Sequence, residues 1–316
     1  MNCVGKIVYE GKCVRGRDVT VLDCVVCGFK HVHPLPTEEQ MQEYYKKQYF
    51  ETEKPNYEHA SGTLSEYQKI VDDKKLVVAG IPREPIFKGV SQKRVLDVGC
   101  GPTAPFLQHI CQNPNVIANK SHNIISGIEP SLPVIMGGWQ MIKQSEMWMV
   151  IYRSWEVMRN HHPDMKFDII HLGFVMEHLV NPMAMLLKCK EHLDENGVLI
   201  IESPNDFNPL QMAIWDGKSV PWWVSTPDHI NYFTPQTMMT LLERAGLRNT
   251  QHVETTYPVE HFLLTGLDYR VDAAAAKAVR DRRANCQAMW QASQGGIYPH
   301  LHGRTFWVAT KVKEDY

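Results

Sequence analysis

Short apolar segments alternate with amphipathic ones from residue 93 onward, and this alternation restricts the possible folds more than any other feature of the chain. Residues 182–193 and 234–246 place apolar side chains at helical spacing, and Thr234 and Pro235 suit the start of the second helix. Strands that alternate with such helices form a parallel sheet covered on both faces. The sequence therefore predicts an α/β fold, with strands over 93–99, 124–130, 147–153, 167–174 and 197–203.

The first of these strands runs into a glycine-rich turn, VLDVGCGPTAPF, at the end of the sheet where a ligand usually binds. Gly99 and Gly101 can adopt positive φ and have no Cβ, so a ligand can approach the backbone closely. A dinucleotide-binding turn prefers a third glycine, but Ala104 stands at that position. Asp97 suits a cationic ligand such as S-adenosylmethionine, and Glu129 suits the hydroxyls of its ribose. An NAD-dependent oxidoreductase is the alternative interpretation.

Four motifs occur in the order that is typical of class I S-adenosylmethionine-dependent methyltransferases: LDVGCG, the acid of GIEP, FDIIHLGFVMEHLVNP and GVLIIESPN. Over residues 93–256 the chain resembles the small-molecule branch of that family, which includes ubiquinone-biosynthesis-type enzymes. The resemblance implies a Rossmann-like, seven-stranded methyltransferase sheet that binds S-adenosyl-L-methionine and releases S-adenosyl-L-homocysteine. It also implies that the turn contacts the methionine part, that the acid holds the ribose, and that residues after the third strand contact the adenine.

The cofactor-binding residues that follow from this resemblance are Asp97, Gly99, Cys100, Gly101, Glu129, Pro130, Ser154, Trp155, Leu172 and Gly173. The chain departs from the family at Pro102 and Thr103, where the family often has GCGTG. This departure leaves a second alternative open, in which the chain is a catalytically inactive, methyltransferase-like binding module.

Four of the eight cysteines lie within the first 27 residues and indicate a small N-terminal unit. Cys24 and Cys27 flank two residues on a tight turn, a spacing that suits one structural zinc ion with four ligands. The predicted ligands are Cys3, Cys13, Cys24 and Cys27. His31 or His33 is a possible replacement for one thiolate. The segment DCVVCGFKHVHPLPTEEQMQEYYKKQYF resembles the second half of the ribbon that precedes many sugar methyltransferases, and a ribbon that has lost its metal is the alternative.

Two histidine-containing segments are candidates for the acid–base chemistry of methyl transfer. His178 follows the fourth strand beside the expected cofactor, where a structural role is the alternative. The segment VPWWVSTPDHINYFTP belongs to a long connection after the fifth strand, and long connections are often functional. Its Asp-His-x-x-Tyr sequence is similar to the Glu-His-x-x-Tyr pattern of sugar C-methyltransferases. The resemblance implies His229 as the base, Asp228 as its orienting partner and Tyr232 as a further participant. In the alternative, these residues only hold the loop and enter the core.

The chain is expected to consist of a cysteine-containing ribbon unit over 1–50, a helical linker over 51–92, the cofactor domain over 93–256, and a C-terminal helix and edge hairpin over 257–316. The expected reaction is O-methylation of a sugar, sugar nucleotide or phosphorylated metabolite in polysaccharide or natural-product biosynthesis. Sugar C- or N-methylation is an alternative. The residues after 256 are too few for the further C-terminal domain of the sugar C-methyltransferases.

A net charge of −2 does not favour nucleic acid as a partner. No apolar run reaches the roughly 20 residues that a membrane span needs, and the first residues lack the apolar core of a signal peptide. The sequence therefore predicts a cytoplasmic monomer or homodimer with a small-molecule acceptor.

Overall fold

The computed structural model describes residues 3–45, 94–101, 106–107, 124–130, 149–208, 211–212, 215, 217–218, 220–221, 223–252 and 305–312. The predicted helical linker over 51–92, residues 257–304 of the predicted C-terminal region, and residues 102–104 of the glycine turn lie outside these residues. Of the helices that the structure describes, none is both long and apolar enough to cross a membrane.

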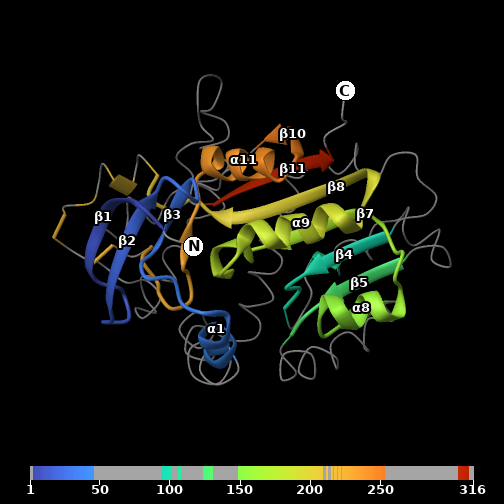
Figure 1. Cartoon of the computed structure of the whole chain (residues 1–316), viewed down its shortest axis with the longest axis horizontal. Coiled ribbons are helices and arrows are strands. Elements are labelled where there is room, and N and C mark those ends of the chain that lie inside the picture. The colour runs from blue at the N-terminus through green and yellow to red at the C-terminus, as the bar shows by residue number, and fades with distance from the viewer. Residues whose placement is uncertain are drawn as a thin grey trace, which may run out of the picture.

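The larger of two sheets has seven strands in the order β10-β11-β8-β7-β4-β5-β6 (Figure 1). Its strands are β4 (Arg94–Val98), β5 (Ile124–Ile128), β6 (Val150–Tyr152), β7 (Phe167–Gly173), β8 (Leu193–Pro204), β10 (Leu247–His252) and β11 (Thr305–Val312). The five strands from β4 to β8 are mutually parallel, which confirms the predicted α/β fold. β11 runs antiparallel to both β8 and β10, so it lies inside the sheet and β10 forms the edge.

The described helices are α1 (Glu38–Tyr44), α8 (Trp155–His161), the 3₁₀ turn η2 (Met176–His178), α9 (Pro182–His192) and α11 (Pro235–Arg244). α11 packs on β10 and β11, α9 on β8, and α8 on β6. Asn181 caps α9 and Thr234 caps α11, and each helix has proline at its first position. The predicted start of α11 at Thr234 and Pro235 is therefore confirmed.

A second, antiparallel sheet holds the N-terminal unit in the order β1-β2-β3-β9 (Figure 1). Its strands are β1 (Gly5–Lys12), β2 (Asp18–Cys24), β3 (Phe29–Val32) and β9 (Asn231–Tyr232). β9 belongs to the long connection between β8 and α11, and it pairs with β3 through Lys30–Tyr232 and His31–Asn231. The long connection of the cofactor domain is therefore part of the N-terminal sheet.

The two sheets also share apolar side chains. Phe29 of β3 belongs to the main core, and its ring centroid lies 4.8 Å from that of Phe233. Tyr9 and Cys13 of the N-terminal unit pack in a second cluster with Trp223 and Tyr232 of the connection. Both clusters fix the long connection between the N-terminal sheet and the large sheet.

We expect Phe29→Ala to lower the free energy of unfolding by about 3–5 kcal/mol, because it leaves a cavity between the sheets. Val25→Ala is the matched control: the Val25 side chain is 78% exposed, so its removal should change stability little. Chemical denaturation of both variants measures the difference. Equal stabilities would show that Phe29 does not join the two sheets energetically.

Candidate active site

The glycine turn after β4 has the geometry that its sequence predicts. Gly99 and Gly101 have φ of +68° and +67°, which side chains disfavour. The backbone N–H groups of Gly99 and Cys100 donate to the Ile128 carbonyl at 2.8 and 3.2 Å, which joins the turn to the end of β5. A Cβ on Gly99 would stand 2.7 Å from Cγ2 of Val175, so glycine is required there by both conformation and space.

Glu129 lies directly after β5, beside the turn. Its Oε2 accepts the N–H of Gly101 at 3.1 Å, and its side chain is buried. Pro130 follows as an exposed residue. The structure thus brings together the turn and the acid that the resemblance assigns to the methionine part and the ribose of the cofactor, at the carboxyl edge of the sheet.

Asp97 is buried at the same edge, and its nearest ionic partner is a protein side chain. Its Oδ1 lies 2.8 Å from Nδ1 of His171 on β7, and Nε2 of His171 lies 3.9 Å from Oε1 of Glu202 on β8. Phe106 stacks on the imidazole at 4.0 Å. Burial alone would lower the pKa of His171, but the neighbouring carboxylates raise it to about 9. Burial also raises the pKa of Asp97, so the two side chains share a proton in a buried contact that cross-links β4 and β7.

His171 and Glu202 were absent from the sequence-based prediction. A signal for them does exist, since each is a polar residue inside an otherwise apolar strand, in FDIIHLG and LIIES. Buried polar side chains of this kind are normally paired, and strands β7 and β8 lie side by side.

Ser154 and Trp155 follow β6 at the carboxyl edge. Ser154 is the N-cap of α8, and its hydroxyl accepts the N–H of Val157 at 3.3 Å. Trp155 is buried, with its ring 5.2 Å from that of His192. The pair stands where the resemblance places the adenine contact, and that role remains a proposal.

Leu172 and Gly173 end β7 in the same region. The Leu172 side chain is fully buried in the main core, so only its backbone can face a ligand. A Cβ on Gly173 would stand 2.6 Å from the imidazole of His171. The next residue, Phe174, has φ of +56°, a strained conformation that is common at functional sites.

The two histidine-containing segments meet in one cluster, which we define as Glu177, His178, Asp228 and His229. Nδ1 of His178 lies 2.8 Å from the carbonyl oxygen of Asp228 and 3.2 Å from its Oδ1. The rings of His178 and His229 are 5.0 Å apart, centroid to centroid. Residues about fifty positions apart therefore form a single acid–base cluster next to β7 and β8.

Backbone and side-chain contacts fix this cluster. The Asn231 amide donates to the carbonyls of Met176 and Leu179 at 3.1 and 2.7 Å, and the Ile230 N–H donates to the Glu177 carbonyl. Tyr232 is buried in the core, and its hydroxyl donates to the His229 carbonyl at 3.2 Å. Tyr232 thus contacts the backbone of the loop that carries His229.

The structure pairs Asp228 differently from the prediction. Asp228 was expected to orient His229, but its closest imidazole is that of His178, and its Oδ2 also lies 3.6 Å from a guanidinium nitrogen of Arg15. His229 stands between two carboxylates, with Nε2 3.9 Å from Asp228 Oδ2 and Nδ1 3.9 Å from Asp206 Oδ2. His229 therefore has acidic neighbours on both sides.

The charges of the cluster follow from burial and proximity. Burial alone would lower the pKa of His178, but Asp228 raises it to about 9. Burial alone would raise the pKa of Asp228, but His178, His229 and Arg15 lower it to about 2. Burial raises the pKa of Glu177 to about 7. The opposite shifts of His178 and Asp228 have one cause, since each side chain stabilises the charged form of the other.

The His178–Asp228 pair should make stability depend on pH. Its contribution is complete below the ordinary pKa of 6.5 and is lost as the pH rises through the folded value of about 9. It is also lost as the pH falls from 3.8 through about 2. We expect the melting temperature of the wild type to fall on the alkaline side, and to fall less in His178→Gln. The same alkaline decline in both proteins would contradict the pairing.

The structure does not assemble the four predicted zinc ligands. Cys3, Cys24 and Cys27 lie together with His31, whereas Cys13 is buried elsewhere, with its Sγ 3.5 Å from the Thr226 carbonyl oxygen. His31, the alternative ligand that the sequence offers, is therefore the fourth member of the group in place of Cys13. Of the described residues, one other group presents closely spaced ligand atoms, within 4.8 Å: Glu177, His178 and His229.

The large sheet has seven strands, and β11, the strand next to its edge, is antiparallel to its neighbours. A glycine turn follows β4, and an acid follows the adjacent parallel strand β5. Together these features define a class I S-adenosylmethionine-dependent methyltransferase. The chain belongs to the methyltransferase domain family, whose profile matches residues 67–252. S-adenosylmethionine is therefore the cofactor of this domain, as the sequence motifs predicted.

Two curated relatives and one solved structure illustrate the similarity. A ubiquinone biosynthesis O-methyltransferase of Dinoroseobacter shibae is 28% identical over 165 residues, which are 51% of this chain and 61% of that protein. One of Cereibacter sphaeroides is 34% identical over 86 residues, which are 26% of this chain and 34% of that protein. Magnesium protoporphyrin IX methyltransferase from Synechocystis with bound S-adenosylhomocysteine matches with 12% identity and a TM-score of 0.49, over 88% of this chain and 100% of that chain. The match spans less than two thirds of either curated relative.

Proposed function

We propose that the protein transfers the methyl group of S-adenosylmethionine to a hydroxyl oxygen of a small polar acceptor. A sugar, a sugar nucleotide or a phosphorylated metabolite is the proposed acceptor class. The observation that carries this proposal is the acid–base cluster of Glu177, His178, Asp228 and His229 at the carboxyl side of β7 and β8. The cofactor supplies the electrophilic methyl group, and the protein has to supply a base that takes the proton of the attacking hydroxyl.

In the proposed reaction, the acceptor oxygen attacks the methyl carbon in line with the carbon–sulfur bond, which breaks as the carbon–oxygen bond forms. The hydroxyl proton moves to the imidazole of His229, which the carboxylates of Asp206 and Asp228 stabilise as a cation. The products are the methyl ether and S-adenosylhomocysteine. Glu129 and the glycine turn hold the cofactor, while Tyr232 and Asn231 hold the loop that presents His229.

Two considerations support oxygen and a polar acceptor. The curated relatives are named as O-methyltransferases. The acid–base cluster is built from charged side chains, which a polar acceptor can engage through its own hydrogen bonds.

The test is an incubation with methyl-labelled S-adenosylmethionine and fractionated metabolite pools, followed by NMR of the labelled product. Label in a methoxy group of a polar metabolite is expected. Label on carbon or nitrogen would instead support the C- or N-methylation alternatives.

Calorimetry separates the remaining alternatives. Tight binding of NADH without binding of S-adenosylhomocysteine would favour an oxidoreductase. Binding of S-adenosylhomocysteine without transfer to any pool would favour an inactive binding module.

A further inference from the structure

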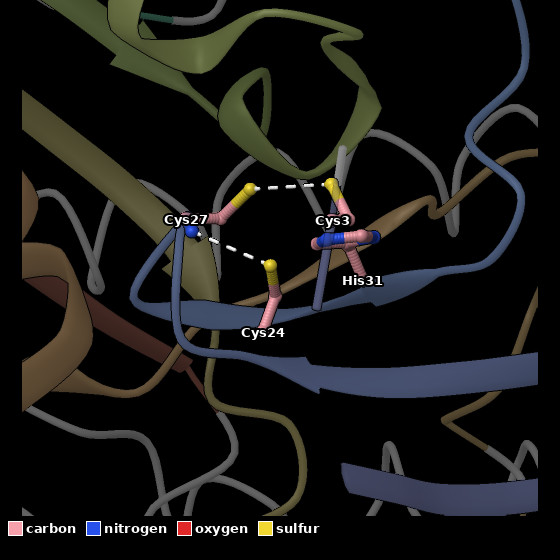
Figure 2. Close-up of side chains that lie close together, drawn as sticks. All are labelled: Cys3, Cys24, Cys27 and His31. Carbon is pink, nitrogen blue, oxygen red and sulfur yellow. Dashed lines mark hydrogen bonds between the residues drawn. The ribbon is translucent and has the colours of Figure 1, made fainter. Parts of the chain in front are cut away.

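Four potential metal-ligating side chains converge at one end of the N-terminal sheet. Cys3 precedes β1, Cys24 ends β2, Cys27 lies in the turn that follows, and His31 lies on β3. Figure 2 shows the three sulfur atoms and the imidazole gathered around one point, and one ligand atom from each residue lies within 4.8 Å of all the others. They come from three separate segments, so only folding brings them together.

The spacing of the sulfur atoms suits a metal and does not suit a disulfide. Sγ of Cys3 lies 3.8 Å from Sγ of Cys27. Two thiolates on one tetrahedral zinc ion, each about 2.3 Å from the metal, are separated by about 3.8 Å. A disulfide would bring the two sulfur atoms to about 2.05 Å. The separation of Cys3 and Cys27 therefore matches that of two thiolates on a shared ion.

His31 supplies an independent indication. Its side chain is fully buried, and Nδ1 lies 2.7 Å from the Val32 carbonyl oxygen, so Nδ1 carries the proton. Nε2 then has a lone pair without a well-formed hydrogen bond to the described residues, and the imidazole interacts with the thiol of Cys24, another of the four side chains. A metal bond at Nε2 would satisfy this buried nitrogen. A histidine held by a backbone carbonyl in this way is the usual geometry of a metal ligand.

The turn between β2 and β3 also has the features of a metal-binding turn. The N–H of Cys27 donates to Sγ of Cys24 at 3.4 Å, which stabilises a thiolate. Gly28 has φ of +83°, which lets the chain reverse directly after the second cysteine. Arg244, at the end of α11, donates to the Cys27 carbonyl and so ties the turn to the cofactor domain.

We propose that Cys3, Cys24, Cys27 and His31 bind one structural zinc ion, with Cys13 excluded from the site. All four tetrahedral positions are then occupied by protein, so the ion stabilises the fold and takes no part in methyl transfer. His31 pairs with Asn231 across β3 and β9, and the Asn231 amide holds the turn that contains Glu177 and His178. The ion would therefore help to hold the acid–base cluster in place. That this cluster acts on the acceptor rests on the proposed function.

The first experiment measures zinc by mass spectrometry in reduced, full-length protein purified without chelators. About one zinc ion per chain is expected in the wild type and in Cys13→Ser, which removes a buried cysteine outside the site. Cys24→Ser and Cys27→Ser should lose most of the zinc, whereas His31→Cys should retain it, because a fourth thiolate replaces the imidazole. A wild type without zinc, or a Cys13→Ser variant as depleted as Cys24→Ser, would overturn the proposal.

A second experiment does not depend on the folding of any variant. Wild-type protein whose zinc is exchanged for Co²⁺ should show the visible absorption of tetrahedral cobalt and the near-ultraviolet bands of cobalt–thiolate bonds. Octahedral cobalt spectra, or an intact mass two hydrogens lower that reveals a Cys3–Cys27 disulfide, would refute the site. Neither readout uses methyl transfer, so failure of the proposed function would leave the zinc result unaffected.

Discussion

Glu129→Ala is expected to weaken the binding of S-adenosylhomocysteine by about 10²-fold or more. Hydrogen bonds to a carboxylate contribute about 1.5–3 kcal/mol each, and the proposed ribose contact makes two of them. Each 1.4 kcal/mol corresponds to about a tenfold change in affinity. The variant also loses the contact between Oε2 and the N–H of Gly101, which shapes the turn. Isothermal titration calorimetry measures the dissociation constant directly.

Two control variants separate the ribose contact from a general loss of charge or fold. Glu129→Gln keeps an oxygen that can accept the Gly101 N–H, so its affinity should lie between those of the wild type and Glu129→Ala. Glu156→Ala removes an acid on α8 whose side chain is 60% exposed, and it should bind normally. If Glu129→Ala bound S-adenosylhomocysteine as tightly as the wild type, the cofactor would have to lie elsewhere.

The cofactor half of the site could be predicted because it is local in sequence. Gly99 and Gly101 share one turn, and Glu129 ends the next strand, so a parallel sheet brings them together without further information. The partner of Asp97 could not be predicted in the same way. His171 reaches it only because β4 and β7 are neighbours, with Asp97 and His171 in register.

The zinc ligands show why spacing along the chain misleads in an antiparallel sheet. Gly5 pairs with Cys24 at one end of β1, so Cys3 lies beside the turn that holds Cys24 and Cys27. Cys13 follows the other end of β1, and a strand of 8 residues spans roughly 25 Å. The sequence could identify the cysteine unit, but only the register between β1 and β2 selects which cysteines meet.

The acid–base cluster depends on the contact between the two sheets. Residues 228–232 were predicted to be functional from the length of their connection, and the structure places them against the η2 turn because β9 pairs with β3. No local pattern predicts that a strand of 2 residues, β9, pairs with a sheet formed by the first 32 residues of the chain. The pairing of Asp228 with His178 in place of His229 follows from that same placement.

His229→Ala is expected to lower kcat by about 10²-fold or more while the affinity for S-adenosylhomocysteine stays near that of the wild type. General base catalysis contributes about 10²–10⁴-fold, and His229 is the histidine of the cluster that has a carboxylate on each side, at 3.9 Å from each ring nitrogen. The glycine turn and Glu129, which are proposed to hold the cofactor, follow β4 and β5 and are distant from this loop in the chain. Single-turnover kinetics and calorimetry on the same preparation measure the two quantities.

The comparison with His178 decides whether His229 acts as a base or only supports the loop. His178→Gln removes the partner of Asp228, so it should lower both stability and kcat, and the remaining activity should keep the pH profile of His229. His229→Ala should instead abolish the acidic limb of the profile, because no imidazole then titrates with the reaction. His161→Ala, an exposed histidine on α8, should change neither quantity. If His229→Ala kept the acidic limb and the turnover of the wild type, another group, such as Glu177 with its pKa of about 7, would have to take the proton.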